Sequence, residues 1–265
     1  MGFPLPLPNV LRQALGSADR LRATTLDLAL LAGHIVMYPT GIGPRPKTLP
    51  APGAGHPPVL LLHGLIDNRT VFRPLARALS ARGDRHVEAI NYCPLTSDIR
   101  TAAGQLALHV EDLCLRTGHS EVDVVGHSLG GLIARYYVQC LGGDHRVRTA
   151  VTLGTPHRGT RVVPLMNAHP LVRQMRPTSE IIQRLAEAAP DCRTRFVSFW
   201  SNLDPVIEPV ESASLDHPDL LAENVPVTGI GHLALPAHPA TIARIHEVLE
   251  AARPREVSAR STSVA

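Results

Sequence analysis

A serine framed by glycines is the first group in this sequence whose neighbours suggest chemistry. Ser128 lies in Gly126-His127-Ser128-Leu129-Gly130-Gly131, directly after residues 122–125, which are typical of a buried strand, and directly before a helical pattern. Gly126 and Gly130 let strand and helix pass close together at such a sharp turn, so the hydroxyl projects away from the core. The helix N-terminus behind it offers unpaired N–H groups and a dipole that favours negative charge. The pattern predicts that Ser128 is a nucleophile.

A serine hydroxyl needs a base to take its proton, and the chain holds fourteen histidines. His232 follows the last expected strand in Gly229-Ile230-Gly231-His232-Leu233, and glycines on this approach allow an imidazole to fold back over the sheet edge. An elbow turns His127 away from the serine. His63 and His157 compete for the role, but we interpret both as shaping the pocket. We predict His232 as the base and interpret three others as helix or surface histidines: His34, His109 and His119.

The imidazole in turn needs an acid that fixes its tautomer and stabilises its cation. Asp204 follows the penultimate expected strand, and Pro205 stiffens its loop. We predict Asp204, which gives the chain order serine, aspartate, histidine. The rivals in the same region are Glu208, Glu211 and Asp216.

A tetrahedral intermediate also needs hydrogen-bond donors aimed at its oxyanion. One expected donor is the N–H of Leu129, immediately after the serine. The other is the N–H of Leu65, which Gly64 could direct into the same space from the loop after the first core strand. The alternative for His63-Gly64 is an ordinary turn at the end of a strand.

Strand and helix patterns alternate along the core of the chain. Residues 59–62 form a short apolar run without alternation, which is typical of a strand covered on both faces. We therefore expect an α/β fold with a mostly parallel, doubly wound sheet and helices on both faces, and chemistry beyond the carboxyl ends of its strands. The further expected strands are about 86–91, 122–125, 149–153, 195–200 and 224–228, and the expected helices are about 71–82, 98–117, 129–141 and 240–251.

The chain divides into three expected parts. Residues 1–54 hold a helix at 21–37 and a Pro/Gly-rich linker, residues 55–252 form the catalytic domain, and residues 253–265 form a disordered tail. Residues 160–190 break the alternation and form a small cap or lid. Its apolar residues either make an exposed flap or cover the sheet edge; they are Val162, Val163, Leu165, Met166, Leu171, Val172 and Met175.

Composition and charge limit the classes of partner and the cellular locations that we expect for this protein. The net charge is only +3 with scattered charges, so no nucleic-acid footprint is expected, and the four cysteines match no metal-ligand spacing. No segment is long enough to span a membrane. Asp27 interrupts the start of the apolar run 28–37, and no small-residue cleavage site follows it, so a cytoplasmic or membrane-peripheral place is favoured over secretion. The helix at 21–37 is expected to rest on the domain or on a lipid surface.

Taken together, these motifs resemble the bacterial lipase/esterase branch of the α/β-hydrolase fold, over about 57–250. Its marks here are residues 59–65, the Ser128 frame, Gly231-His232 and Leu153-Gly154-Thr155-Pro156-His157-Arg158-Gly159, whose Gly-Thr-Pro-His segment recurs in triacylglycerol lipases. The resemblance implies Ser128, Asp204 and His232 as catalytic residues, Leu65 and Leu129 as oxyanion donors, ester or lipid substrates and no organic cofactor. Many relatives are secreted and some bind calcium or zinc. This sequence has no cluster that demands a metal, although Asp67 and His157 stay open as ligands.

The function expected from the sequence is a serine carboxylester hydrolase that works through an acyl-enzyme, with no cofactor and no protein partner. Two alternatives use the same fold. An acyltransferase would pass the acyl group from Ser128 to an alcohol or amine, and a non-catalytic binding module would need none of the three catalytic side chains.

Overall fold

The structure is a computed structural model that describes residues 9–43, 55–81, 83, 85–92, 98–162 and 169–252. Within the first range, side chains are described from residue 18 onward. The expected tail 253–265 and most of the expected linker lie outside the described residues.

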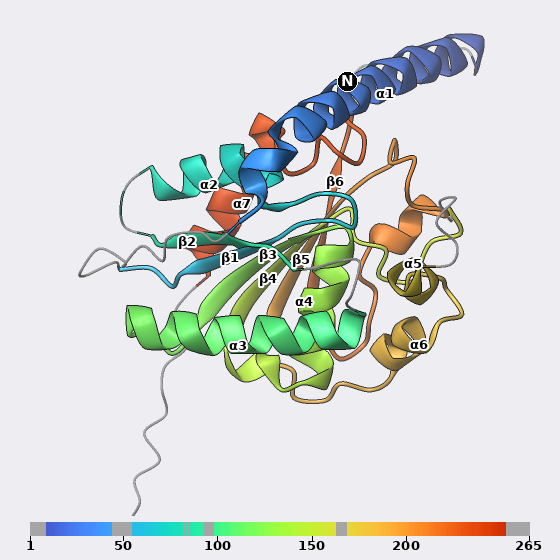
Figure 1. The fold of residues 1–265 in the computed structure, drawn as a ribbon. Helices are drawn as coiled ribbons and strands as arrows, with labels where there is room; N and C mark the ends of the chain where they lie inside the picture. Colours follow the sequence, from blue (N-terminus) through green and yellow to red (C-terminus); the bar gives the residue numbers. More distant parts are fainter. Residues whose placement is uncertain are drawn as a thin grey trace, which may run out of the picture.

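A six-stranded sheet forms the centre of the molecule, with all neighbouring strands parallel (Figure 1). The strand order is β2-β1-β3-β4-β5-β6. The strands are β1 Val59–Leu62, β2 Val87–Ile90, β3 Val122–His127, β4 Val147–Leu153, β5 Arg195–Ser201 and β6 Leu221–Val227. The sequence prediction of a mostly parallel, doubly wound α/β sheet is confirmed.

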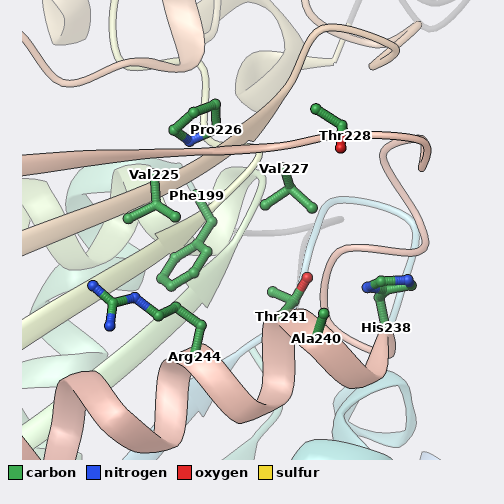
Figure 2. Close-up of a pocket in the computed structure, with 9 residues that line it drawn as sticks. All are labelled: Phe199, Val225, Pro226, Val227, Thr228, His238, Ala240, Thr241 and Arg244. Atoms are coloured by element: carbon green, nitrogen blue, oxygen red, sulfur yellow. The ribbon is translucent and has the colours of Figure 1, made fainter. Parts of the chain in front are cut away.

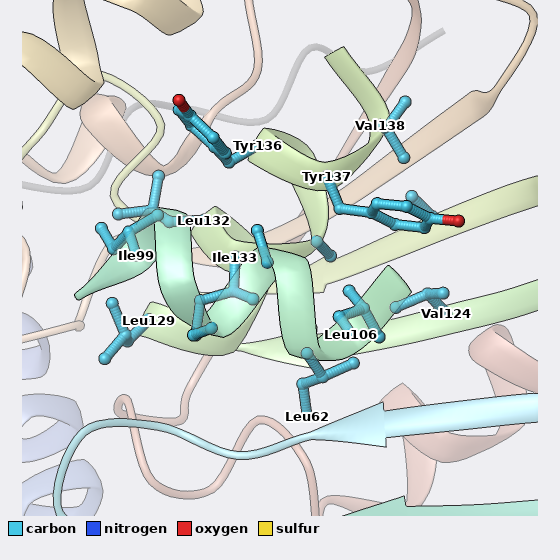
Figure 3. Packing of buried hydrophobic residues seen from close by; sticks show 14 of the residues in the cluster. Leu62, Ile99, Leu106, Val124, Leu129, Leu132, Ile133, Tyr136, Tyr137 and Val138 are labelled. Atoms are coloured by element: carbon cyan, nitrogen blue, oxygen red, sulfur yellow. The ribbon is translucent and has the colours of Figure 1, made fainter. Parts of the chain in front are cut away.

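Helices cover both faces of this sheet (Figure 1). The long helices α3 (Ile99–Thr117) and α4 (Leu129–Cys140) pack on one face, and α2 (Arg73–Ser80) and α7 (Pro239–Ala251) pack on the other. The alternation of side chains along β1 explains the two cores, because Leu60 and Leu62 face α3 and α4 whereas their neighbours Val59 and Leu61 face α2 and α7. Figure 3 shows the first of these cores, in which Leu62 and Val124 lie beneath side chains of the helices.

The N-terminal helix is longer than the sequence pattern indicated. The helix expected at 21–37 is α1, which spans Asn9–Gly41 and includes Pro39 in its last turn. Residues 9–20 contain no proline, several good helix formers and apolar residues at helical spacing, which together extend the helix; the apolar residues are Val10, Leu11, Ala14, Leu15 and Ala18. Figure 1 shows α1 on the side of the sheet that carries α2 and α7, with its first half extending beyond the rest of the molecule.

The expected cap region contains two short helices, α5 (Pro170–Gln174) and α6 (Glu180–Ala186). Leu171, Val172 and Met175 are buried in the core on the α3 and α4 side, so these residues cover the sheet and do not form an exposed flap. Val163, Leu165 and Met166, which the sequence analysis placed in the same region, lie outside the described residues.

A groove of about 310 Å³ lies between β6 and α7, lined among others by Phe199, Val227 and Arg244 (Figure 2). None of the predicted catalytic residues lines this groove. In the described part of the chain, no helix combines the length and the apolar character that crossing a bilayer requires.

Candidate active site

Ser128 occupies the turn between β3 and α4 in a strained backbone conformation. Its φ is 54° and its ψ is −118°, a region that residues other than glycine rarely adopt, at a cost of about 1–3 kcal/mol. The surroundings hold this conformation: the Ser128 N–H donates to the carbonyl of Leu153 at 2.8 Å, and the Thr155 hydroxyl donates to the Ser128 carbonyl at 3.0 Å. Strain that is fixed in this way is typical of functional sites.

The glycines around the serine are required by close backbone contacts. A Cβ at Gly126 would lie 2.5 Å from the Gly131 nitrogen, and a Cβ at Gly130 would lie 2.3 Å from the Leu62 carbonyl oxygen. This agrees with the interpretation that Gly126 and Gly130 let strand and helix pass close together. Gly131 is equally constrained, because a Cβ there would overlap the Thr155 hydroxyl.

His232 and Asp204 form a buried pair at the carboxyl ends of the strands. The Nδ1 atom of His232 lies 2.6 Å from Oδ2 of Asp204, and the two side chains are 5% and 1% exposed. Asp204 follows β5 and its other oxygen accepts a hydrogen bond from the Val206 N–H at 2.8 Å. The rival acids Glu208, Glu211 and Asp216 are exposed. Of the acids considered from the sequence, Asp204 is the one that the structure brings to His232.

Charge around the imidazole raises the pKa of His232 above its ordinary value. Burial disfavours the charged ring, but the Asp204 carboxylate favours it through its charge and its hydrogen bond, and Asp27 and Asp67 add to this effect. The net result is a base that binds a proton more tightly than a free imidazole.

The serine turn and the imidazole share neighbours. A Cβ at Gly154, which follows the Leu153 carbonyl that holds the serine, would lie 3.0 Å from Nδ1 of His232 and 3.1 Å from Oδ2 of Asp204. The residue before the serine is also involved, because Nε2 of His127 lies 3.1 Å from the His232 carbonyl oxygen and the two rings are 4.7 Å apart. Ser128 and His232 are thereby brought to one place on the sheet edge.

The sequence interpretation turned His127 away from the serine, and the structure shows that its ring contacts His232. Its side chain is buried against His232, and burial together with the His232 charge lowers the pKa of His127 to about 4. His127 is therefore a neutral ring that supports the backbone of the predicted base. In the sequence, the one signal for this supporting role was the position of His127 directly before Ser128.

One predicted oxyanion donor, Leu129, directly follows the serine along the chain, and the other, Leu65, belongs to a loop that lies against the serine. Leu129 is the first residue of α4, so its N–H is among those that a helix leaves unpaired. Leu65 follows Gly64, and a Cβ at Gly64 would lie 3.4 Å from the Ser128 Cβ, so this loop lies against the serine. The Gly64 carbonyl is held by the His63 ring at 2.7 Å and by the Tyr92 hydroxyl at 3.3 Å.

The competing histidines are engaged in supporting contacts. His63 stacks on Tyr92 with ring centroids 4.4 Å apart, and Nε2 of His157 lies 2.9 Å from the Thr152 hydroxyl. Burial lowers the pKa of both. Arg135 donates to the His157 carbonyl at 3.0 Å. These contacts hold both rings in place, and their role in shaping the pocket stays a prediction.

The residues left open as metal ligands have protein partners. Asp67 lies 3.2 Å from His34 and 3.7 Å from His127, and His157 contacts Thr152. Across the described ranges, His, Cys, Asp and Glu side chains form no group of three or more that could hold a metal ion. His34, interpreted from the sequence as a helix or surface histidine, lies on α1 and also reaches the loop after β1.

Comparison with known proteins gives the family. A family model described as the alpha/beta hydrolase fold matches residues 57–191, just over half of the chain. A triacylglycerol lipase from Pseudarthrobacter phenanthrenivorans and one from Burkholderia plantarii are each 39% identical over 56 residues, which is 21% of this chain. The matched stretch spans 17% and 15% of the length of these relatives.

Solved structures agree on the fold. The mature lipase BlEst2 from Bacillus licheniformis has a TM-score of 0.62 at 16% identity, covering 77% of this chain and 96% of that one. Lipase B from Aspergillus fumigatus has a TM-score of 0.65 at 18% identity, covering 81% of this chain and 64% of that one. At these low identities, both similarities show a shared fold and nothing beyond it.

Proposed function

This chain belongs to the α/β-hydrolase fold family, and from that premise we propose that it is a serine carboxylester hydrolase with Ser128, His232 and Asp204 as its catalytic residues. The observation that carries the proposal is the strained turn at Ser128, with φ 54°, beside the buried His232–Asp204 pair. A serine held in this way at a helix N-terminus directs its hydroxyl away from the core, and here the residue is 9% exposed.

The geometry supports a two-step reaction. The Ser128 hydroxyl oxygen attacks the ester carbonyl while Nε2 of His232 takes its proton, because Nδ1 is occupied by Asp204. The oxyanion forms against the N–H groups of Leu65 and Leu129. The proton passes from His232 to the departing alcohol, which leaves an acyl group on the serine. His232 then takes a proton from water, the resulting hydroxide attacks the acyl carbonyl, and the acid leaves as the serine regains its proton.

Exposed apolar residues that neighbour the predicted site residues along the chain support esters with an acyl chain as substrates. Ile66, directly after Leu65, is 59% exposed, and Val206, two residues after Asp204, is 36% exposed. The names of the matched relatives, triacylglycerol lipases, support the same substrate class. A chain-length series of soluble and emulsified esters would measure the preference.

Replacement of the nucleophile is the direct test. Ser128→Ala removes the attacking oxygen, so we expect kcat for 4-nitrophenyl butyrate to fall by roughly 10³–10⁶-fold, in line with triad deletions. The matched control is Ser80→Ala, at the exposed end of α2, which should keep wild-type kinetics. Circular dichroism checks that both variants are folded. Hydrolysis by folded Ser128→Ala at a rate near that of wild type would contradict the proposal.

A further inference from the structure

Helix α1 precedes the family match, which begins at residue 57, yet it contacts the loop that carries the predicted base. Asp27 is 8% exposed, whereas its neighbours Leu26 and Leu28 are 40% and 61% exposed. A buried acid among exposed apolar residues on a surface helix is unusual and needs a partner. The partner is the segment around His232.

The carboxylate of Asp27 contacts this segment on both sides of His232. Its Oδ1 accepts a hydrogen bond from the Ala234 N–H at 3.1 Å. A Cβ at Gly231 would lie 2.2 Å from its Oδ2, so the carboxylate occupies the space that a side chain at 231 would need. The sequence analysis explained the glycines before His232 by the freedom they give the imidazole to fold back. The structure gives Gly231 a different explanation, because the absence of a side chain there makes room for Asp27.

A second contact from the same face of α1 reaches the other predicted catalytic loop. His34 is seven positions after Asp27, about two helical turns, and its Nδ1 lies 3.2 Å from Oδ1 of Asp67. Asp67 lies in the loop that holds Leu65, and its other oxygen is 3.7 Å from His127, which contacts the His232 carbonyl. One helix face therefore touches both loops.

We propose that Asp27 is a positioning residue of the active site, which fixes the loop of His232 and places a second carboxylate near its imidazole. The proposal rests on the proposed function, in which His232 is the base. The groups that face this imidazole are Asp204 after β5, Asp27 on α1, Asp67 after β1 and His127 at the end of β3. Asp27 is the one supplied from the segment that precedes the matched region.

The first test compares Asp27→Asn, Asp27→Ala and the matched control Asp19→Asn, an exposed acid on the same helix. The amide can still accept from Ala234 but lacks the charge, so kcat for 4-nitrophenyl butyrate should fall about tenfold, with KM within about twofold. The alanine loses both contacts, and a misplaced base should cost about 100-fold in kcat. Asp19→Asn should match wild type.

The pH profile separates positioning from general damage. The base must be uncharged to act, so kcat/KM rises with pH as His232 loses its proton. The Asp27 charge raises the pKa of His232, and its removal should move this acid limb to lower pH in both Asp27 variants. Unchanged kcat, or a loss of kcat with an unshifted limb, would overturn the proposal.

Gly231→Ala probes the same contact without altering α1. The new methyl group pushes on the carboxylate, so kcat should fall, whereas the same change in the Asp27→Ala background should cost little more than Asp27→Ala alone. Additive losses would contradict a direct contact. If Asp27→Ala does not fold, the kcat of Gly231→Ala alone tests the contact: a fall supports it, and an unchanged value contradicts it.

A titration of His232 by NMR distinguishes this proposal from the proposed function. The ring signal is identified by its loss in His232→Gln, and its pKa should be lower in Asp27→Asn than in wild type. A wild-type protein that cleaves no ester but shows this difference would refute the hydrolase and support Asp27. An active wild type with the same His232 pKa in Asp27→Asn would refute Asp27 alone.

Discussion

The two ends of the parallel sheet each bury ionised side chains, and they differ in backbone strain and in the presence of a buried base with a raised pKa. At the amino end, Asp123 on β3 accepts from Arg148 through both oxygens, at 3.0 and 2.6 Å, and from Arg85 at 3.1 Å. The arginines have further acceptors, since Arg85 also donates to Glu250 and Arg148 to the Leu249 carbonyl. We call these residues the amino-end cluster.

The carboxyl end holds the carboxyl-end cluster of Ser128, Asp204 and His232 with its supports. Here the serine backbone is strained, and two neighbouring ring atoms, His63 Nε2 and His127 Nδ1, are buried without a hydrogen-bond partner among the described residues. Burial of charge is common to both ends. Among the described residues, a strained serine beside a buried base with a raised pKa occurs only at the carboxyl end of the sheet, which is why we assign the chemistry there.

The largest effect that separates the clusters is expected for Asp204→Asn. Without the carboxylate, His232 can adopt the tautomer that carries the proton on Nε2, and its cation loses its partner. We therefore expect kcat to fall by about 10⁴-fold, while the unfolding midpoint changes little. Because Asp204 raises the pKa of His232, the acid limb of kcat/KM should also move to lower pH. The control Asp216→Asn changes an exposed acid of the same region. A kcat of Asp204→Asn equal to that of wild type would contradict the assignment of the chemistry to the carboxyl-end cluster.

The converse prediction concerns Asp123→Asn in the amino-end cluster. Removal of this charge leaves Arg85 and Arg148 buried with an incomplete partner set, which should lower the free energy of unfolding by about 3–5 kcal/mol. Urea unfolding measures the loss, and kcat of the folded enzyme should stay within about twofold of wild type, since no contact with the predicted catalytic residues changes. Glu111→Gln breaks a surface pair with Arg146 and should cost at most about 1 kcal/mol. A large fall in kcat with stability retained would reverse the roles of the two ends.

A smaller effect is expected at the surface next to the carboxyl end. Leu21, Leu28 and Ile35 are spaced by seven residues on α1 and are 70%, 61% and 66% exposed, on a helix whose Asp27 is buried. We propose that this apolar face contacts lipid, which would bring the active site to its substrate.

Vesicle sedimentation tests this contact. Leu28→Glu/Ile35→Glu should lower binding to phosphatidylcholine–phosphatidylglycerol vesicles by about tenfold. The matched control is Leu108→Glu/Leu115→Glu, which changes two exposed apolar residues seven positions apart on α3 and should bind as wild type does. Equal binding by both double variants would refute the lipid contact.

Much of the fold could be predicted because its signals are local. The apolar run of β1 and the glycines around Ser128 report directly on burial and close backbone contact, and the sheet follows from their alternation with helices. Asp204 and His232 could be proposed because each follows a strand whose carboxyl end must meet the same edge. Their spacing of 2.6 Å in the structure agrees with that reasoning, although their catalytic roles stay predictions.

The supports of the site were not predictable in the same way, since they depend on where a distant helix docks. Asp27 stood out in the sequence only as a charge that interrupts an apolar run, and nothing local relates residue 27 to residue 234. His34 and His127 likewise have roles that arise from tertiary contacts. A charged residue on the apolar face of a helix was the available signal, and it indicates a buried partner without identifying it.

The central claim is that Ser128 is an activated nucleophile, and covalent labelling tests it most directly. The native protein is treated with a fluorophosphonate, digested and analysed by mass spectrometry. The account predicts one phosphonyl group on the peptide that contains Ser128, absent from Ser128→Ala, from His232→Gln and from heat-denatured protein. A folded wild-type protein that takes no label, or that carries it on another residue, would contradict the account.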